Sequence, residues 1–77
     1  MQNEVTHTVE AIMSKEYMQA EYKQLCTRIH NLTTYIKKNI RNDNLMEIDL
    51  KEKQLQAMTQ YKNILELRAA LNNIDLS

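Results

Sequence analysis

The stretch MQAEYKQLCTRIHNLTTYI, residues 18–36, decides the fold of this chain. Its apolar side chains recur at steps of 4, 3, 4, 3 and 4 residues, at Met18, Tyr22, Leu25, Ile29, Leu32 and Ile36. Such steps place side chains on one helix face, and a stripe this narrow is typical of a coiled-coil seam. Because Ser14 is a suitable N-cap, the pattern predicts a helix over residues 14–40.

A polar break separates this helix from a second one. The side chains of Asn42-Asp43-Asn44 compete for backbone hydrogen bonds, which predicts a loop over residues 41–48. Asp49 and Glu52 have the spacing of a capping box, and a second helix is expected over residues 49–73. Since the loop is short, the two helices should pack as antiparallel neighbours.

The two ends of the chain carry their own signals. Apolar residues at helical spacing (Val5, Val9, Ile12 and Met13) predict either a short separate N-terminal helix or arm over residues 1–13, which we favour, or an extension of the helix that follows. At the other end, Asn73 should take the left-handed conformation, with Ile74 folding back onto the last turn. Gly and Pro are absent, which favours helices over hairpin turns. We therefore expect a single all-α domain over residues 1–77, an antiparallel helical hairpin.

The size of the chain points to self-association. A domain of 77 residues has a thin core and usually needs a disulfide, a metal or a partner chain. Cys26 is the only cysteine, so no disulfide forms within the chain and no zinc set of Cys and His exists. A homo-oligomer is the remaining stabiliser. A lone cysteine, no signal peptide and no apolar run that spans a bilayer indicate a cytoplasmic protein without a membrane partner.

Composition also argues against several functions. The net charge is zero, although residues 15–41 hold six of the ten basic side chains. This balance argues against binding to duplex nucleic acid but suits a small anion. His7 and His30 are the only histidines, and no catalytic triad can be read from the sequence. Cys26 and His30 are two ligands at most, so neither an enzyme, a metal site nor a cofactor is predicted.

Three polar residues along the second helix are the main functional signal. Gln54, Tyr61 and Arg68, here called the polar ladder, recur every seven residues between apolar positions. A centre line of this kind normally carries Leu or Ile, because an unpartnered buried polar group costs several kcal/mol. Either the ladder faces a polar pocket between chains or its side chains reach past the core to water. Arg68 is the member that a hairpin core explains least.

The first helix offers a second polar set. Arg28 stands in mid-helix at the edge of the apolar stripe, followed by Asn31 and Thr34 along one flank. A guanidinium, an amide and a hydroxyl suit phosphate and base edges, and they equally suit a wet interface between hairpins. Tyr17 and Tyr35 also flank the stripe, where a phenol covers a groove or stacks on a flat ligand.

The spacing of both helices resembles a known family. The first helix reads Glu21-Tyr22-x-x-Leu25-x-x-Arg28-Ile29-x-x-Leu32-x-x-Tyr35-Ile36. The second reads Gln54-Leu55-Gln56-Ala57-Met58-Thr59-Gln60-Tyr61, then Ile64-Leu65-Glu66-Leu67-Arg68-Ala69, and closes on Asn73-Ile74-Asp75-Leu76. Over residues 14–76 this resembles small phage-encoded helical-hairpin proteins, similar to the anti-CBASS sponges that oligomerise and sequester cyclic nucleotide signals without cleaving them.

The resemblance implies roles for particular residues. Arg28 would contact the nucleotide, Arg68 would reach a phosphate, and Thr27 or Asn31 would add hydrogen bonds. The family pattern expects a stacking aromatic near the N-terminus, and residues 1–14 contain none. Tyr17 or His7 would have to take its place.

Two hypotheses about function follow. The first is a phage anti-defence protein, active in the cytoplasm of the infected cell, that sequesters a small anionic nucleotide signal. Its ligand-binding residues would be Arg28, Arg68, Tyr61, Asn31 and Tyr17, supported by Arg–phosphate pairing and Tyr stacking. The alternative is an interaction module that inhibits a host defence protein by helix packing, with no small ligand.

Overall fold

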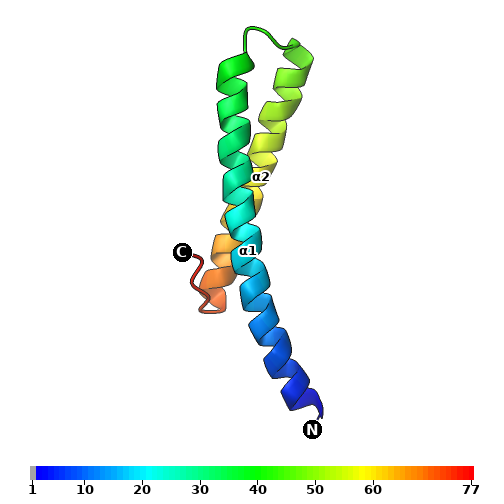
Figure 1. The fold of residues 1–77 in the computed structure, drawn as a ribbon, viewed down its shortest axis with the longest axis vertical. Helices are drawn as coiled ribbons and strands as arrows, with labels where there is room; N and C mark the ends of the chain where they lie inside the picture. Colours follow the sequence, from blue (N-terminus) through cyan, green and yellow to red (C-terminus); the bar gives the residue numbers. More distant parts are fainter. Residues whose placement is uncertain (1) are drawn as a thin grey trace.

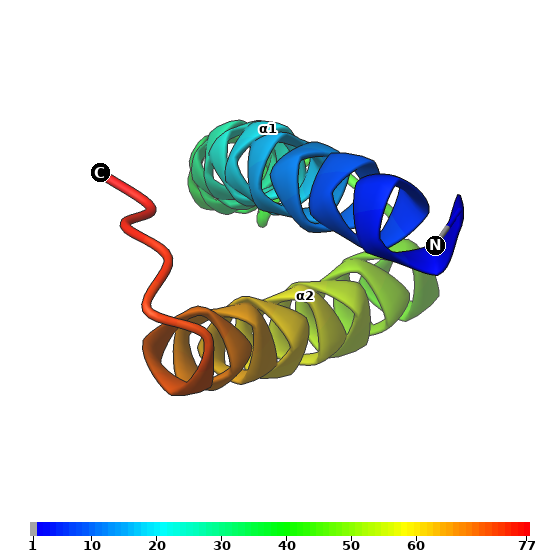
Figure 2. The ribbon, with the colours of Figure 1, turned by 90° about the horizontal axis from the view of Figure 1, so that it is seen from below.

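Two antiparallel α-helices make up the fold. The structure is a computed structural model that describes the backbone of residues 2–77 and the side chains of residues 15–77. Helix α1 (Gln2–Asn39) and helix α2 (Leu45–Leu71) are joined by a short loop, as Figure 1 shows. Seen from below in Figure 2, the two helices lie side by side in one layer. The expected all-α hairpin is confirmed for these residues.

Helix α1 is longer than expected and corrects the N-terminal boundary. It runs unbroken through Ser14, so residues 2–13 continue α1 instead of forming a short helix of their own. Without a Gly or Pro nearby, nothing interrupts the backbone hydrogen bonds at that point. The first turns of α1 therefore project past the end of α2 in Figure 1, and the chain extends over 60 × 21 × 16 Å.

The loop between the helices ends earlier than the capping box suggested. The side-chain oxygen of Asn44 accepts a hydrogen bond from the backbone N–H of Met46 at 2.8 Å, and α2 begins at Leu45. Because Asn44 already satisfies an N-terminal donor, Asp49 is left inside the helix. There it pairs with Lys53, one turn on, at 2.9 Å.

The C-terminal end of α2 forms the expected cap. Asn73 has φ of 55°, and the N–H of Ile74 donates to the carbonyl of Ala69 at 2.8 Å. This is a Schellman motif, and it folds Ile74 onto the core as expected. The remaining tail then turns toward α1, where Gln19 Nε2 donates to the carbonyl of Asp75 at 2.6 Å (Figures 1 and 2).

The core is a single seam between the two helices, here called the hairpin seam. Its α1 side is confirmed as Met18, Tyr22, Leu25, Ile29, Leu32 and Ile36, all buried or half-buried. Its α2 side consists of Ile48, Leu55, Met58, Leu65 and Ala69. Neither described helix is long and apolar enough to cross a membrane.

Candidate functional site

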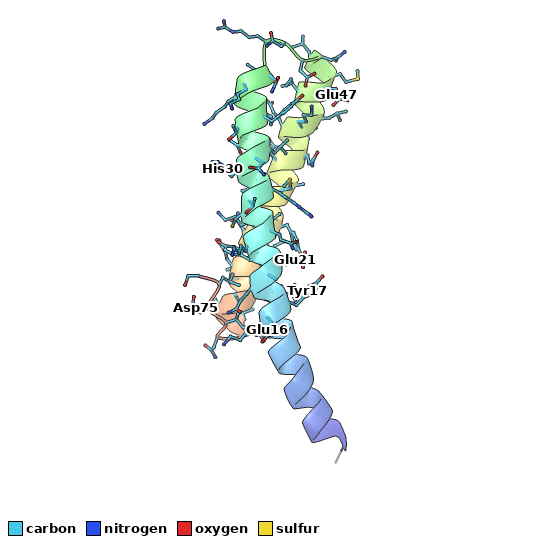
Figure 3. The ribbon with its side chains drawn as sticks, viewed as in Figure 1. Glu16, Tyr17, Glu21, His30, Glu47 and Asp75 are labelled. Atoms are coloured by element: carbon cyan, nitrogen blue, oxygen red, sulfur yellow. The ribbon has the colours of Figure 1, made fainter. Side chains whose placement is uncertain are left out.

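A polar row lies beside the hairpin seam on α1. Each of its members precedes a seam residue by one position and so lies about 100° round the helix. Figure 3 shows two of them, Tyr17 and Glu21, projecting from the same side of α1. The full row is Tyr17, Glu21, Gln24, Arg28, Asn31 and Tyr35.

This row and α2 enclose a shallow groove. It consists of two depressions of about 290 and 460 Å³, which adjoin because Arg28, Gln54 and Met58 line both. The first depression is also lined by Glu21, Gln24, Leu25 and Tyr61, and the second by Asn31, Leu32, Tyr35 and Lys51. Together these residues are called the groove. Its apolar floor and polar walls are the composition of a small-molecule site.

One end of the groove is closed by a contact between the helices. The hydroxyl of Tyr61 donates to Glu21 Oε1 at 2.7 Å. This hydrogen bond to a carboxylate is the main reason that the pKa of Tyr61 is raised, and burial adds to it. Tyr17 and Arg68 lie near enough to act on the same phenol, Tyr17 raising its pKa and Arg68 lowering it. Tyr61 is therefore a neutral hydrogen-bond donor to Glu21 at neutral pH.

The other end is built around Lys51. Its Nζ lies 3.1 Å from Asp43 Oδ2, 3.8 Å from Glu47 Oε2 and 4.1 Å from the centre of the Tyr35 ring. Tyr35 also donates its hydroxyl proton to Asp43 at 3.0 Å. The hydrogen bonds from Lys51 and then Tyr35 hold the pKa of Asp43 below its usual value, and Asp43 in turn raises the pKa of Lys51. The charge of Lys51 is thus already matched within the hairpin.

Arg28 differs from Lys51 in this respect. It lies in the middle of the groove and lines both depressions. Among the side chains of residues 15–77, the ion pairs are made by Lys51 and Lys53, and Arg28 is in none of them. An exposed guanidinium keeps its charge and offers a planar pair of donors to a phosphate or carboxylate. It is the cation with which the groove can meet an anion.

The residues selected from sequence fall into two groups. Arg28, Asn31 and Tyr61 line the groove. Tyr17, exposed over 71% of its surface, and Arg68 lie near Tyr61 but line neither depression.

Tyr35, which the sequence placed beside the stripe as a phenol that covers a groove, also lines the second depression. Three polar lining residues were not singled out from the sequence, namely Glu21, Gln24 and Lys51. The repeat of polar residues one position before each residue of the α1 seam is the signal that would have found the two on α1. Lys51 carries no such signal, because its place on α2 is that of a seam residue, where the pattern predicts an apolar side chain.

The opposite face holds a different contact. Tyr22 donates its hydroxyl proton to Glu66 Oε2 at 2.6 Å, and this hydrogen bond together with burial raises the pKa of Tyr22. Cys26 adjoins Tyr22 there as a free, half-buried thiol. In the described part of the chain, no three His, Cys, Asp or Glu side chains gather into a set that could hold a metal ion.

Comparison with known proteins identifies the family of the chain. No curated protein matches it, and no solved structure does. A protein family described as Sequestin matches residues 14–71, which span nearly all of α2 and the part of α1 that packs against it. That description implies a protein that binds and holds a target, in line with the resemblance to sponge proteins. The chain belongs to the Sequestin family.

Proposed function

We propose that this protein captures a small anionic nucleotide, of the cyclic oligonucleotide type, in the groove and holds it without cleaving it. Stoichiometric capture of an immune signal would make it a phage anti-defence protein in the cytoplasm of the infected cell. The family description supports sequestration as the mode of action. The observation that carries the choice of ligand is Arg28, a guanidinium that is in none of the ion pairs formed among residues 15–77 and lies in a groove bordered by two tyrosines.

The charges along the groove suggest how a nucleotide would lie. A phosphate is attracted to Arg28 and can accept two parallel hydrogen bonds from its guanidinium. Glu21 at one end repels a phosphate, whereas Asn31 offers an amide donor on the other side of Arg28. These charges favour a phosphate position between Arg28 and Asn31, away from Glu21.

The remaining lining groups suit the nucleoside. Tyr35 and Tyr61 border the groove on either side of Arg28, and phenol rings provide flat surfaces for base stacking. Gln24 and Gln54 carry amide groups, which donate to and accept from base edges and ribose hydroxyls. In this arrangement Arg28 pairs with the negative charge of the phosphate, and the tyrosines supply apolar contact to the base.

A binding panel tests the proposal directly. Purified protein is titrated calorimetrically with cyclic di- and trinucleotides and with nucleotide-sugar signals, and the ligand is recovered by denaturation and analysed by chromatography. Arg28→Ala should weaken binding by about 10- to 100-fold, the value of a charge-assisted hydrogen bond or two. Arg41→Ala is the matched control, because this exposed arginine in the loop lies outside the groove. Recovery of a hydrolysed nucleotide, or equal losses in both variants, would contradict the proposal.

The alternative function has its own observation in its favour. Several apolar side chains of α2 are exposed, Leu67 and Leu71 among them, and an exposed apolar helix face is what packing on a host protein requires. A purified host defence protein that binds this chain, with no heat from any nucleotide and with binding lost in Leu67→Lys, would support this alternative.

A further inference from the structure

Helix α2 carries a second apolar stripe that the hairpin leaves uncovered. Its positions recur at steps of 4, 3, 4, 3, 4, 3 and 4 residues, and they define the outer stripe: Met46, Leu50, Lys53, Ala57, Gln60, Ile64, Leu67 and Leu71. All eight residues are exposed, and the large apolar ones range from 51% at Ile64 to 83% at Leu71. Soluble monomers rarely expose an apolar patch of more than roughly a few hundred Å², so a stripe along the whole helix indicates a partner.

We propose that the occupant of the outer stripe is the outer stripe of a second copy, packed antiparallel. The outer stripe is self-complementary in that direction. With a twofold axis near residue 58, each stripe residue of one copy lies opposite a different stripe residue of the other copy. Leu50 then lies opposite the partner's Leu67, and Met46 lies opposite the partner's Leu71. Because the outer stripe lies on the side of α2 that faces away from α1, two hairpins joined in this way form a row of four helices with the two copies of α2 in the middle.

The polar members of the stripe favour the antiparallel direction. A parallel pair would place the two copies of Lys53 in the same layer, where like charges repel. The antiparallel pair places Lys53 opposite the partner's Ile64, and its ammonium keeps its partner Asp49 at 2.9 Å. Ala57 and the partner's Gln60 fill the central layer. A small residue opposite a flexible amide fits there without a buried charge.

The flanks of the outer stripe add charge complementarity. On the flank that faces the groove lie Glu47 and the polar ladder. In the antiparallel register Glu47 lies opposite the partner's Arg68, and Gln54 lies opposite the partner's Tyr61. Within one hairpin Arg68 is in none of the ion pairs formed by residues 15–77. The pairing thus gives a partner to the arginine that the hairpin leaves exposed.

This register also changes the groove. Gln54 lines both depressions, so a partner helix along this flank brings a second copy of Tyr61 to the groove wall. The shallow groove of one hairpin becomes deeper, with residues of both copies along its rim. This last step rests on the proposed function, whereas the pairing itself does not.

The oligomeric state tests the pairing. Sedimentation equilibrium of the full chain should give about twice the 9.1 kDa of one copy. Ile64→Lys should raise the dissociation constant of the dimer by at least about 100-fold, while the helix content by circular dichroism stays unchanged. Leu45→Lys is the matched control, since Leu45 is 80% exposed but lies off the stripe. A monomeric wild type would overturn the pairing and would favour a host protein as the occupant of the outer stripe. A dimer that Ile64→Lys leaves intact would also overturn the pairing, because its interface would lie elsewhere.

A charge swap tests the direction. Arg68→Glu alone should weaken the dimer by about 2- to 30-fold, because it removes two symmetry-related ion pairs. Glu47→Arg should weaken it as well and also loses the contact of Glu47 with Lys51 inside the hairpin, so this variant is compared at equal helix content. The double variant restores the pairs between copies with their signs exchanged and should dimerise more tightly than Glu47→Arg alone. A double variant that dimerises more weakly than Glu47→Arg would exclude the antiparallel register.

Nucleotide affinity separates this inference from the proposed function. A monomeric Ile64→Lys variant should bind the panel ligand more weakly than the wild-type dimer does. Equal binding by the monomer would overturn the shared groove and leave the proposed function standing. No binding by the wild-type dimer would overturn the proposed function and leave the pairing standing.

Discussion

Two leucines of α2, Leu65 and Leu67, are only two residues apart in the chain but lie on different sides of the helix. They allow a matched test of the packing. Leu65 is 2% exposed in the hairpin seam, and Leu67 is 67% exposed on the outer stripe. Leu65→Ala removes the same atoms as Leu67→Ala and changes helix propensity equally. Any difference between the two variants in the free energy of unfolding therefore reports burial alone.

The expected magnitude follows from the size of the core. A buried Leu→Ala substitution costs about 2–5 kcal/mol, through lost apolar burial and the cavity that remains. A domain of this size has a total stability of only roughly 3–5 kcal/mol from its core. Six apolar residues are buried in the described part of the chain, and Leu65 is among the two most buried. Leu65→Ala should therefore lower the melting temperature by about 10 °C or more, or unfold the chain outright.

The assay is urea or thermal unfolding followed by circular dichroism at several protein concentrations. Leu67→Ala should cost little at high dilution, where the hairpin is a monomer, and should cost more as concentration rises and dimers form. Leu65→Ala should be destabilising at every concentration. Equal costs for the two variants at high dilution would refute the assignment of Leu65 to the seam and Leu67 to the outer stripe.

Two further predictions concern the C-terminal cap and the tyrosines. Asn73→Val should lower the free energy of unfolding by about 1–2 kcal/mol, because a β-branched residue resists the φ of 55°. Urea unfolding of Asn73→Val and of Asn73→Gly checks this, since the glycine variant should be as stable as the wild type or more stable. The folded-state pKa of Tyr22 is raised, so its stabilisation is present below the unfolded pKa of about 10 and is lost as pH rises. Urea midpoints from pH 8 to 11 should therefore fall less in Tyr22→Phe than in the wild type, and parallel slopes would contradict this.

The α1 seam was predictable because only one face of that stretch is apolar. Met18, Leu25 and Ile36 are buried as the steps of three and four residues required. The start of α1 was not predictable from Ser14, since a potential cap ends a helix only where the backbone also departs from helical angles. No Gly or Pro forces such a departure here. At the loop the polar run was located correctly, and Asn44 took the capping role expected of Asp49.

Helix α2 was harder because it carries two apolar stripes. Met58 and Leu65 belong to the hairpin seam, whereas Ala57 and Ile64 belong to the outer stripe. Adjacent positions in sequence merge the two into one wide stripe, on which the polar ladder looks like a buried centre line. Only the position of α1 separates them, and sequence periodicity contains no information about which stripe faces the partner helix.

The position of the polar ladder between the stripes removes the anomaly of polar residues on an apolar face. Gln54, Tyr61 and Arg68 are all exposed in the hairpin, so none bears the cost of unpaired burial. The same position leaves each stripe narrow, and one narrow seam supports only a marginal hairpin. A second copy on the outer stripe would add apolar burial without enclosing the ladder. Because Gln54 and Tyr61 of the ladder also line the groove, self-association and ligand binding would then act on the same edge of α2, and each should strengthen the other.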